Sequence, residues 1–471
     1  MSMQRRWRVL LIVAVGVFMA GLDVFIVNIA FPQIHRDYPG TSLPSLSWIL
    51  NSYTIIFAAF LIAAGRWSDN FGRKRSFLLG TGLFTISSAA CAAAPSIGFL
   101  VGARAFQGLG AALLMPASLG LLLPEFPPER RHVAIGAWAA IGGIAAAAGP
   151  PLGGLLVQAS WRWVFLVNVP FGLASLVVGF RVLREIRHPQ TSRPDLLGAG
   201  LVTVGVATLV AAIVKGPDWG WSSASTIGAF ALAGLMILAV ALRILRHPSP
   251  IVEPALLRVR AFSLATAVSM IFFAGFAAML LACVLFLTGI WHQSVLSAGL
   301  EIFPGPAMAA AWAIPGARLG NRFGPTRVGA IGSLLFSLGG VWWISYLGGA
   351  HHYASDFLPG MMIGGVGVGF VIPSLTGAVA ATLPPERIAT GIAVQITGRQ
   401  IGTALGAATL IAVLGTPSSA QDFSGAWELI LATSVISALL LALTGARAAS
   451  RTAQIVEPPA VDPLISSELA A

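Results

Sequence analysis

Two charged side chains lie inside long apolar segments, where a charge is costly and usually has a task. Asp23 interrupts the apolar run from Val9 to Phe31, and Arg104 lies in another run that begins near residue 98. Burial disfavours the ionised form of a carboxylate, which suits a carrier of protons. Arginine stays charged and therefore needs an acid, a carbonyl or water beside it. We expect Asp23 and Arg104 to pair, so that protonation of the acid breaks the pair and changes helix packing.

Both residues also have a plainer interpretation. Asp23 could be a structural acid that is hydrogen-bonded near the outer end of its helix. Arg104, six residues into its segment, could extend its guanidinium to the membrane interface. Gln107 follows Arg104 by three residues and therefore lies on the same helical face.

Other polar side chains in apolar segments are candidates for lining a substrate cavity. Asn28 fits a hydrogen bond between helices better than a ligand contact. Glu301 could bind a cationic substrate, carry a second proton, or be an interfacial charge on the extracellular side. Arg399 fits a role in holding helices together better than one in carrying protons. The full candidate set is Asn28, Gln107, Glu301, Gln395, Arg399 and Gln400.

The stretch GRWSDNFGRKRSFLLG, residues 65–80, concentrates charge between two apolar segments. It holds the acid Asp69 together with the bases Arg66, Arg73, Lys74 and Arg75. So much charge cannot lie in hydrocarbon, and the stretch must be a tight turn at a membrane surface. Gly65 and Gly72 bracket it, where a sharp turn or a close backbone approach would need glycine.

Composition defines the class of protein that these residues belong to. Of the 471 residues 56% are hydrophobic and 10% are charged, and the mean hydropathy is +0.85. Soluble domains are roughly 25% charged. The chain is therefore predicted to be an all-α polytopic membrane protein, with its 53 glycines suited to close helix packing in lipid.

Several classes of function are excluded or disfavoured by the same sequence. The net charge of +11 comes from bases dispersed between apolar segments, which argues for membrane topology rather than nucleic-acid binding. Cys91 and Cys283 lie in apolar runs and predict neither a disulfide nor a metal site. No Walker A motif is present, so ATP is not expected to drive the protein directly. We expect no cofactor and no enzymatic activity.

Spanning helices need about 20 apolar residues each. Fourteen are predicted, at 9–31, 46–65, 75–95, 98–123, 133–157, 162–183, 195–214, 224–245, 262–288, 296–317, 327–348, 357–381, 388–414 and 426–446. If these segments cross the membrane in alternate directions, 23 of the 28 Lys and Arg residues fall on the side that also holds both termini, and three fall on the other. The positive-inside rule makes the richer side cytoplasmic. No cleavable signal peptide is predicted, because the first apolar run is long enough to span.

An internal repeat divides the chain. Residues 108–130 match residues 365–387 at a constant offset of 257, and both copies end in PPER. The charged turn recurs at Arg318–Arg327, with Asn321 in place of Asp69 and Pro325 in place of Arg73. We predict an N-terminal six-helix half at 1–188, an inserted helix pair at 189–254, a C-terminal six-helix half at 255–450 and a disordered cytoplasmic tail at 451–471. Two similar six-helix halves are a transporter architecture.

Four motifs in order resemble the major facilitator superfamily, in particular its fourteen-helix drug:proton antiporter branch, the QacA/EmrB type. GLDVFIVNIAFP at 21–32 resembles the first-helix motif of that branch, and GARAFQGLGAALLMP at 102–116 resembles the fourth-helix motif. AAAAGPPLGG at 145–154 resembles the fifth-helix antiporter motif. The charged turn resembles the signature of the loop between helices two and three. The resemblance covers nearly the whole chain, from about residue 21 to 447.

The resemblance implies roles for particular residues. It implies proton coupling for Arg104, together with Asp23, and a major facilitator fold. The turn would act as a cytoplasmic gate in which Asp69 caps a helix of the second half and Arg73 pairs with Glu125 or Glu129. Its motif residues are Gly65, Asp69, Gly72, Arg73 and Arg75, and those of the antiporter motif are Gly149, Pro150, Gly153 and Gly154. The second-half turn, which lacks the acid, is expected to lack this electrostatic switch.

We therefore expect a proton-coupled antiporter that exports small lipophilic or cationic compounds by alternating access. An exporter dedicated to one metabolite or antibiotic is the nearest alternative, and a transporter-like sensor that moves nothing is a further one. The expected partners are a small-molecule substrate, protons and membrane lipid, with no nucleic acid and no metal. The expected location is the cell (inner) membrane, with a monomeric chain that crosses it many times.

Overall fold

The computed structural model describes residues 3–127, 131–187, 194–383 and 385–456. Within these ranges the regular elements are all helical. The first part of the chain forms α1 (Met3–Asp37), α2 (Leu43–Leu46), α3 (Trp48–Phe71), α4 (Arg73–Ala92), α5 (Ile97–Leu122), the short η1 (Leu123–Glu125), α6 (Arg131–Ala159), α7 (Trp163–Leu166) and α8 (Asn168–Val182).

The remainder continues in the same way. It forms α9 (Leu196–Trp219), α10 (Ala224–Arg246), α11 (Pro254–Arg258), α12 (Arg260–Gly289), α13 (Val295–Ile302), α14 (Pro304–Phe323), α15 (Pro325–Tyr346), the π-helical η3 (Tyr353–Phe357), α16 (Leu358–Thr382), α17 (Pro385–Leu414), η4 (Ala420–Phe423) and α18 (Ser424–Val456).

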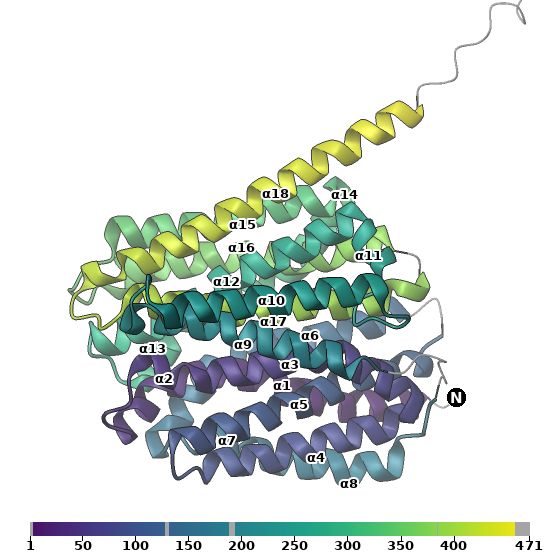
Figure 1. Cartoon of the computed structure of the whole chain (residues 1–471), viewed down its shortest axis with the longest axis horizontal. Helices are drawn as coiled ribbons and strands as arrows, with labels where there is room; N and C mark the ends of the chain where they lie inside the picture. Colours follow the sequence, from purple (N-terminus) through teal and green to yellow (C-terminus); the bar gives the residue numbers. More distant parts are fainter. Residues whose placement is uncertain (1–2, 128–130, 188–193, 384, 457–471) are drawn as a thin grey trace, which may run out of the picture.

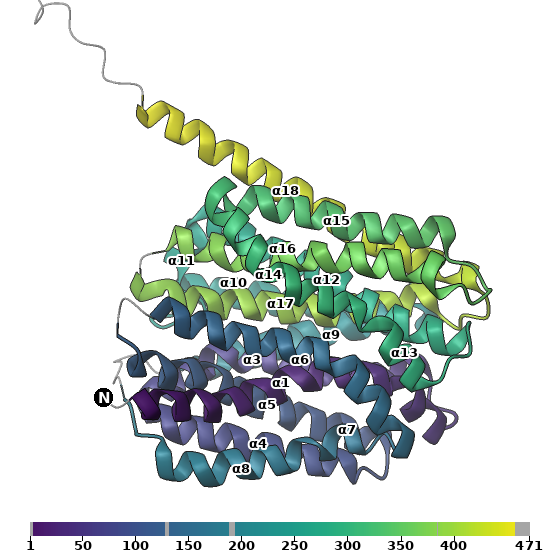
Figure 2. The same ribbon diagram turned by 180° about the vertical axis from the view of Figure 1, so that it is seen from behind.

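The long helices run along one direction, with the first part of the chain on one side and the last part on the other (Figures 1 and 2). The helices from α1 to α8 pack mainly among themselves, as do the long helices from α12 to α18, whereas the short α13 packs mainly on α6. Helix α9 packs on α10 and also contacts both α3 and α17, so this pair lies along the boundary. The start of α1 and the end of α18 lie at the same end of the bundle (Figure 1), which we call the N-terminal end.

Eleven helices in the described ranges are long and apolar enough to cross a membrane. Three further long helices, α4, α14 and α17, have 20, 20 and 30 residues but are not among these eleven spans. The count of fourteen crossings, the inserted pair and the predicted domain limits therefore stay predictions.

Some predicted boundaries differ from the structure. The segment predicted as one helix at 296–317 is divided into α13 and α14 at Phe303, next to Pro304, whose nitrogen cannot donate to the helical ladder. The segment at 162–183 is likewise divided into α7 and α8 around Val167. Helix α18 continues to Val456, beyond the predicted start of the tail at residue 451, and residues 457–471 lie outside the described ranges, so the disordered tail stays a prediction.

Glycine determines how closely α4 and α5 approach. A Cβ added at Gly110 would lie 2.6 Å from the backbone nitrogen of Phe84, and one at Gly80 would lie 2.6 Å from that of Leu114. Backbone atoms cannot move aside as the end of a flexible side chain can. The two glycines therefore allow the α5 backbone, which carries Arg104, to lie directly against α4.

We expect Gly110→Ala to destabilise the protein, by about 1–3 kcal/mol, because overpacking a tight contact shifts backbone. Gly102→Ala on the same helix is the matched control, since a Cβ there meets nothing within 4 Å. Thermal unfolding of the purified variants should show a lower midpoint for Gly110→Ala only. Equal midpoints for the two variants would contradict this account of the α4–α5 contact.

Candidate functional site

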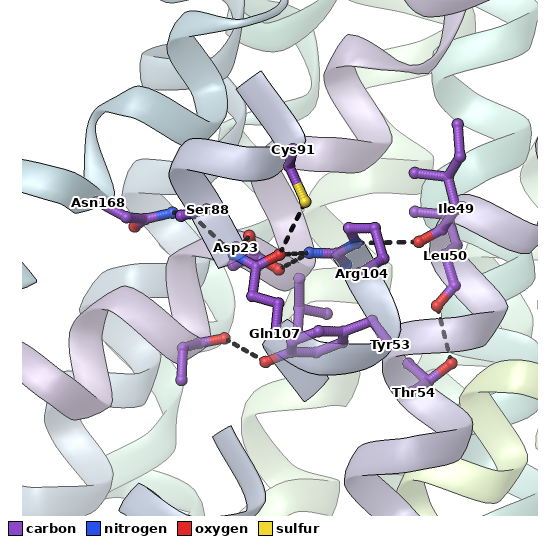
Figure 3. Close-up of polar contacts among 12 residues, drawn as sticks. Asp23, Ile49, Leu50, Tyr53, Thr54, Ser88, Cys91, Arg104, Gln107 and Asn168 are labelled. Carbon is purple, nitrogen blue, oxygen red and sulfur yellow. Dashed lines mark hydrogen bonds and ion pairs between the residues drawn. The ribbon is translucent and has the colours of Figure 1, made fainter. Parts of the chain in front are cut away.

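Asp23 and Arg104 form an ion pair in the interior of the first six long helices. Asp23 lies on α1 and Arg104 on α5, and Nη1 of Arg104 contacts Oδ2 of Asp23 (Figure 3). Their exposed fractions are 0% and 1%. The predicted contact is thus present, and Arg104 points inward rather than to an interface. A buried pair of opposite charges leaves no net charge in the apolar interior.

Gln107 completes the pair from one turn further along α5. Its Nε2 donates to Oδ1 of Asp23 at 3.0 Å, and its Oε1 accepts from Nη1 of Arg104 at 2.7 Å. The same Nε2 also contacts Oγ of Ser88 on α4 at 2.9 Å, and Asn168 on α8 donates to that hydroxyl at 3.0 Å (Figure 3). One hydrogen-bonded network therefore joins the acid on α1 to α4, α5 and α8.

Helix α3 supports the arginine from the other side. Nε of Arg104 donates to the carbonyl of Ile49 at 3.0 Å, and its guanidinium lies 4.3 Å from the centre of the Tyr53 ring. Tyr53 in turn donates its hydroxyl to the carbonyl of Ala20 on α1 at 3.4 Å. Carbonyls and an aromatic face both favour a cation, so these contacts hold the guanidinium whether or not the acid is ionised.

Local sequence explains why α5 presents these residues. Ser96 caps the helix by accepting from the backbone nitrogen of Phe99 at 3.3 Å. Arg104 and Gln107, three residues apart, then share one face. A Cβ added at Gly108 would lie 2.5 Å from the carbonyl oxygen of Tyr53, so glycine is needed there for α3 to lie against α5.

The network has the chemistry of a two-state proton site. While Asp23 is ionised, both of its oxygens accept bonds and the guanidinium is neutralised. Protonation removes the charge that holds Arg104 and gives Asp23 a donor in place of an acceptor. At least one contact in the network must then change, and the change reaches α3, α4, α5 and α8 together.

Sequence reasoning found Asp23, Arg104 and Gln107 but missed their supports. Tyr53, Ser88 and Asn168 were not singled out, and Sγ of Cys91, which lies 3.8 Å from Oε1 of Gln107, was assigned no role. An asparagine inside an apolar segment, such as Asn168, was a usable signal, since a buried amide needs a partner. Serine and tyrosine are too common in helices to stand out.

Two of the other candidates lie elsewhere. The amide of Asn28 donates to the carbonyl of Val24 at 2.7 Å, within its own helix, so the predicted bond between helices was wrong. Glu301 lies in the last turn of α13 beside the loop between α15 and η3, where His351 contacts its carboxylate at 3.1 Å. Tyr353 donates to the backbone carbonyl of Glu301 at 3.2 Å. Neither residue touches the Asp23 network.

The remaining candidates share α17. Gln395 is buried and donates to Oγ of Ser269 on α12 at 3.1 Å. Gln400 is also buried, whereas Arg399 is partly exposed and lies over the ring of Phe273. These residues belong to the second group of helices and are not part of the network around Asp23.

The charged turn is held within the first group of helices. Arg73 binds Asp69 through Nε at 3.0 Å and Nη2 at 2.9 Å, and it donates to the carbonyl of Gly120 at 2.7 Å. Gly72, with φ 121°, ends α3 in a conformation that favours glycine. Gly324 repeats this break between α14 and α15, with φ 93°.

The predicted pairing of Arg73 with Glu125 was wrong, and its alternative, Glu129, stays a prediction. Glu125 pairs with Arg5 at 3.2 Å, not with Arg73, and Glu129 lies outside the described residues. Glu185 follows α8, and its Oε1 accepts a hydrogen bond from the backbone nitrogen of Lys74 at 3.0 Å. Its Oε2 lies 3.7 Å from Nε of Arg75. Within the described ranges, Asp69 caps no helix of the second group. A residue-by-residue motif cannot identify such partners because they come from loops distant in sequence.

The glycine-rich motif of α6 forms a contact between the two groups of helices. A Cβ added at Gly154 would lie 2.8 Å from Cα of Leu296, and one at Gly299 would lie 2.3 Å from the carbonyl oxygen of Pro150. Gly149 and Gly153 on the same helix face α1 instead. Helices α6 and α13 therefore touch backbone to backbone. We call this the α6–α13 contact.

Comparisons with known proteins agree with this architecture. The family model described as Major Facilitator Superfamily matches residues 13–303. A tetracenomycin C resistance and export protein of Streptomyces glaucescens is 34% identical over 408 residues, which cover 86% of this chain and 75% of that protein. The multidrug resistance protein Stp of Mycobacterium tuberculosis is 34% identical over 416 residues, covering 87% and 76%.

Solved structures show the same fold at lower identity. A peptide transporter POT in complex with sulfate superposes with a TM-score of 0.69 at 17% identity, covering 94% of each chain. This likeness is one of fold alone.

Proposed function

The chain belongs to the major facilitator superfamily, and on that premise we propose that it is a proton-coupled antiporter that exports small lipophilic compounds by alternating access. Its relatives are named for resistance to, or export of, drugs and antibiotics. We place it in the fourteen-helix branch, with α9 and α10 as the inserted pair. We further propose an inner-membrane location with both termini cytoplasmic, a monomeric chain, and the proton gradient as the energy source without a cofactor.

The buried Asp23–Arg104 pair is the observation that carries the proposal. Two opposite charges enclosed in an apolar interior are costly to maintain and easily disturbed by a proton. Since Asp23 is fully buried, a proton can reach it only when the surrounding helices rearrange. Coupling then follows: a state that exposes the acid to one side takes up a proton, and a second state releases it on the other.

The α6–α13 contact supports the alternation between such states. It joins the two groups of helices at the end where α13 and the His351 loop lie. Closer to the N-terminal end, Arg66 of α3 donates to the carbonyl of Ser249, between α10 and α11, at 3.2 Å. This contact is made by a flexible side chain and not by two backbones. We propose that the glycine contact is the outer gate, closed here, and that the charged turn belongs to the inner gate.

The turn gives a test of the inner gate. Asp69→Asn should lower the initial export rate by about 2- to 5-fold, because it removes the charge from a partly exposed pair worth up to about 1 kcal/mol. Asp69→Glu should keep part of the rate that Asp69→Asn loses, since glutamate keeps the carboxylate but its side chain is one methylene longer. Initial rates in proteoliposomes, with thermal unfolding as a check of the fold, measure both. An unchanged rate for Asp69→Asn would remove Asp69 from the gate.

Transport itself is tested with the purified chain in proteoliposomes. An imposed pH jump should drive at least one compound of a varied panel, which includes ethidium and tetracenomycin C, against its gradient, and collapse of the jump by an ionophore should stop it. A pH jump that moves none of a varied compound panel would remove the antiport proposal. Movement of tetracenomycin C alone would instead indicate an exporter dedicated to one antibiotic.

A further inference from the structure

Arg399 is a cation in the middle of a long helix. It lies fourteen residues after Pro385 and fifteen before Leu414, the ends of α17. At 1.5 Å per residue this is about 21 Å from either end, beyond the reach of an arginine side chain to a helix end. The guanidinium keeps its charge at this depth. Something must compensate that charge.

No acid of the protein does so in the part of the chain that the structure describes. There the side chain of Arg399 has neither an ion pair nor a hydrogen bond, and its guanidinium carbon lies 4.8 Å from the centre of the Phe273 ring. Arg104 is the instructive comparison, since it is fully buried and has a carboxylate, an amide and a carbonyl around it. Arg399 is instead partly exposed. Within the described residues its guanidinium donors thus have no hydrogen-bond acceptor.

The surroundings show which way Arg399 faces. Gly398 and Gly402 pack against Thr266 and Met270 of α12, so this face of α17 is closed. Arg399 lies at the margin of that contact, over Phe273. On α12, Phe276 follows Phe273 by three residues, and the two rings lie 5.6 Å apart.

The ring under Arg399 is linked to α1 through a neighbouring ring. Phe276 meets Phe25 of α1 edge to face, with ring centres 6.3 Å apart. Arg399 therefore stands at the edge of an aromatic surface that reaches from the second group of helices to the first. We call Phe25, Phe273 and Phe276 the aromatic surface.

The charge balance of the interior selects the class of ligand. Asp23 is already neutralised by Arg104, and Glu301 lies at the α13 end beside His351. An uncompensated positive charge at this depth repels a cation and attracts an anion, and a low-dielectric surrounding strengthens both effects. A guanidinium binds a carboxylate through two parallel hydrogen bonds, and the adjoining rings favour a flat, apolar body.

We propose that Arg399 and the aromatic surface bind aromatic anions, with the guanidinium holding a carboxylate or phenolate and the phenylalanine rings holding the ring system. Resting on the proposed export function, this site makes aromatic acids the substrate class, in place of the cationic compounds expected from the sequence. Arg399 thereby gains a ligand-binding role rather than one in holding helices together.

Binding to the purified full chain tests the site without any proton gradient. Three probes share one ring system and differ in charge: 1-naphthoate, 1-naphthamide and 1-naphthylmethylammonium. Equilibrium dialysis at pH 7 should give the wild-type protein a Kd for 1-naphthoate at least about 10-fold lower than for 1-naphthamide, as a hydrogen bond between charged groups provides. The ammonium probe should bind most weakly.

Variants then assign the preference to Arg399. Arg399→Gln should raise the Kd for 1-naphthoate by at least about 10-fold and change the Kd for 1-naphthamide by no more than about 2-fold. Arg399→Lys should keep the preference for the anion. Arg322→Gln on α14 is the matched control and should change neither. Equal weakening of both neutral and anionic probes by Arg399→Gln would overturn the proposal. If that variant does not fold, a wild-type preference for the amide or the ammonium probe overturns it as well.

Failure of this site is distinguishable from failure of the antiport proposal. Preferential binding of 1-naphthoate without transport driven by a pH jump would remove proton coupling and leave the anion site. Ethidium transport driven by a pH jump, with no preference for 1-naphthoate, would remove the anion site and leave proton coupling.

Discussion

Asp23→Asn is expected to abolish export driven by a pH gradient while leaving exchange of substrate across the membrane intact. The amide cannot bind or release a proton in this range, and so the imposed pH jump should drive no accumulation. The expected fall in initial rate is at least about 10-fold, to the level of liposomes without protein. Substrate counterflow in the absence of a pH gradient should continue, because it needs the gates but not the proton.

The cost of the substitution to stability must be measured beside it. Removing the carboxylate leaves Arg104 buried without its counter-charge. In typical buried pairs this lowers the free energy of unfolding by about 3–5 kcal/mol. The Tyr53 ring and the carbonyl of Ile49 should reduce that loss. Asp218→Asn on α9 is the matched control, with a side chain that is 53% exposed. Asp23→Asn with full proton-driven transport would remove Asp23 from the mechanism, whatever its effect on stability.

Gly299→Val is expected to open the α6–α13 contact and stop the transport cycle. Even a Cβ at this position would lie 2.3 Å from the carbonyl oxygen of Pro150, and valine adds two methyl groups. The two backbones must separate, so the outer gate cannot close in the way described. Initial export rates should fall at least about 10-fold, since a cost of about 1.4 kcal/mol in the closed state already gives that factor.

The separation can be measured directly. Spin labels at Gln158 on α6 and Leu300 on α13, both exposed, report the distance across the contact. We expect a longer mean distance in Gly299→Val than in the labelled parent. Gly143→Ala on α6 is the control, because a Cβ there meets nothing within 4 Å. An unchanged distance distribution with normal export would contradict the assignment of this contact as a gate.

The centre of the site was predictable because its residues are anomalous where they stand. A carboxylate and an arginine stand out in apolar runs, and each of the two charges needs an opposite charge beside it. The pairing of Asp23 with Arg104 followed from that need for compensation. Tyr53 and Ser88 carry no such anomaly. Their contacts depend on how closely α3 and α4 approach α5, which Gly108 and Gly110 determine in three dimensions.

The errors share a physical cause. Asn28 could satisfy its amide within its own helix at Val24, an option that no sequence pattern excludes. Arg73 binds Asp69 and a carbonyl at the end of α5, whereas Glu125 pairs with Arg5. Competition among several bases for few acids depends on loop paths. Sequence order does not fix those paths, although it does fix which segments are helices.

Proton release on substrate binding is the most direct test of proton coupling through Asp23. In weakly buffered solution, adding a substrate identified by the efflux panel to the purified wild-type chain should release protons, seen with a pH-sensitive dye. The same addition to Asp23→Asn, at matched occupancy, should release none. Release that is equal in the two proteins, or absent from the wild type although substrate binds, would contradict the account.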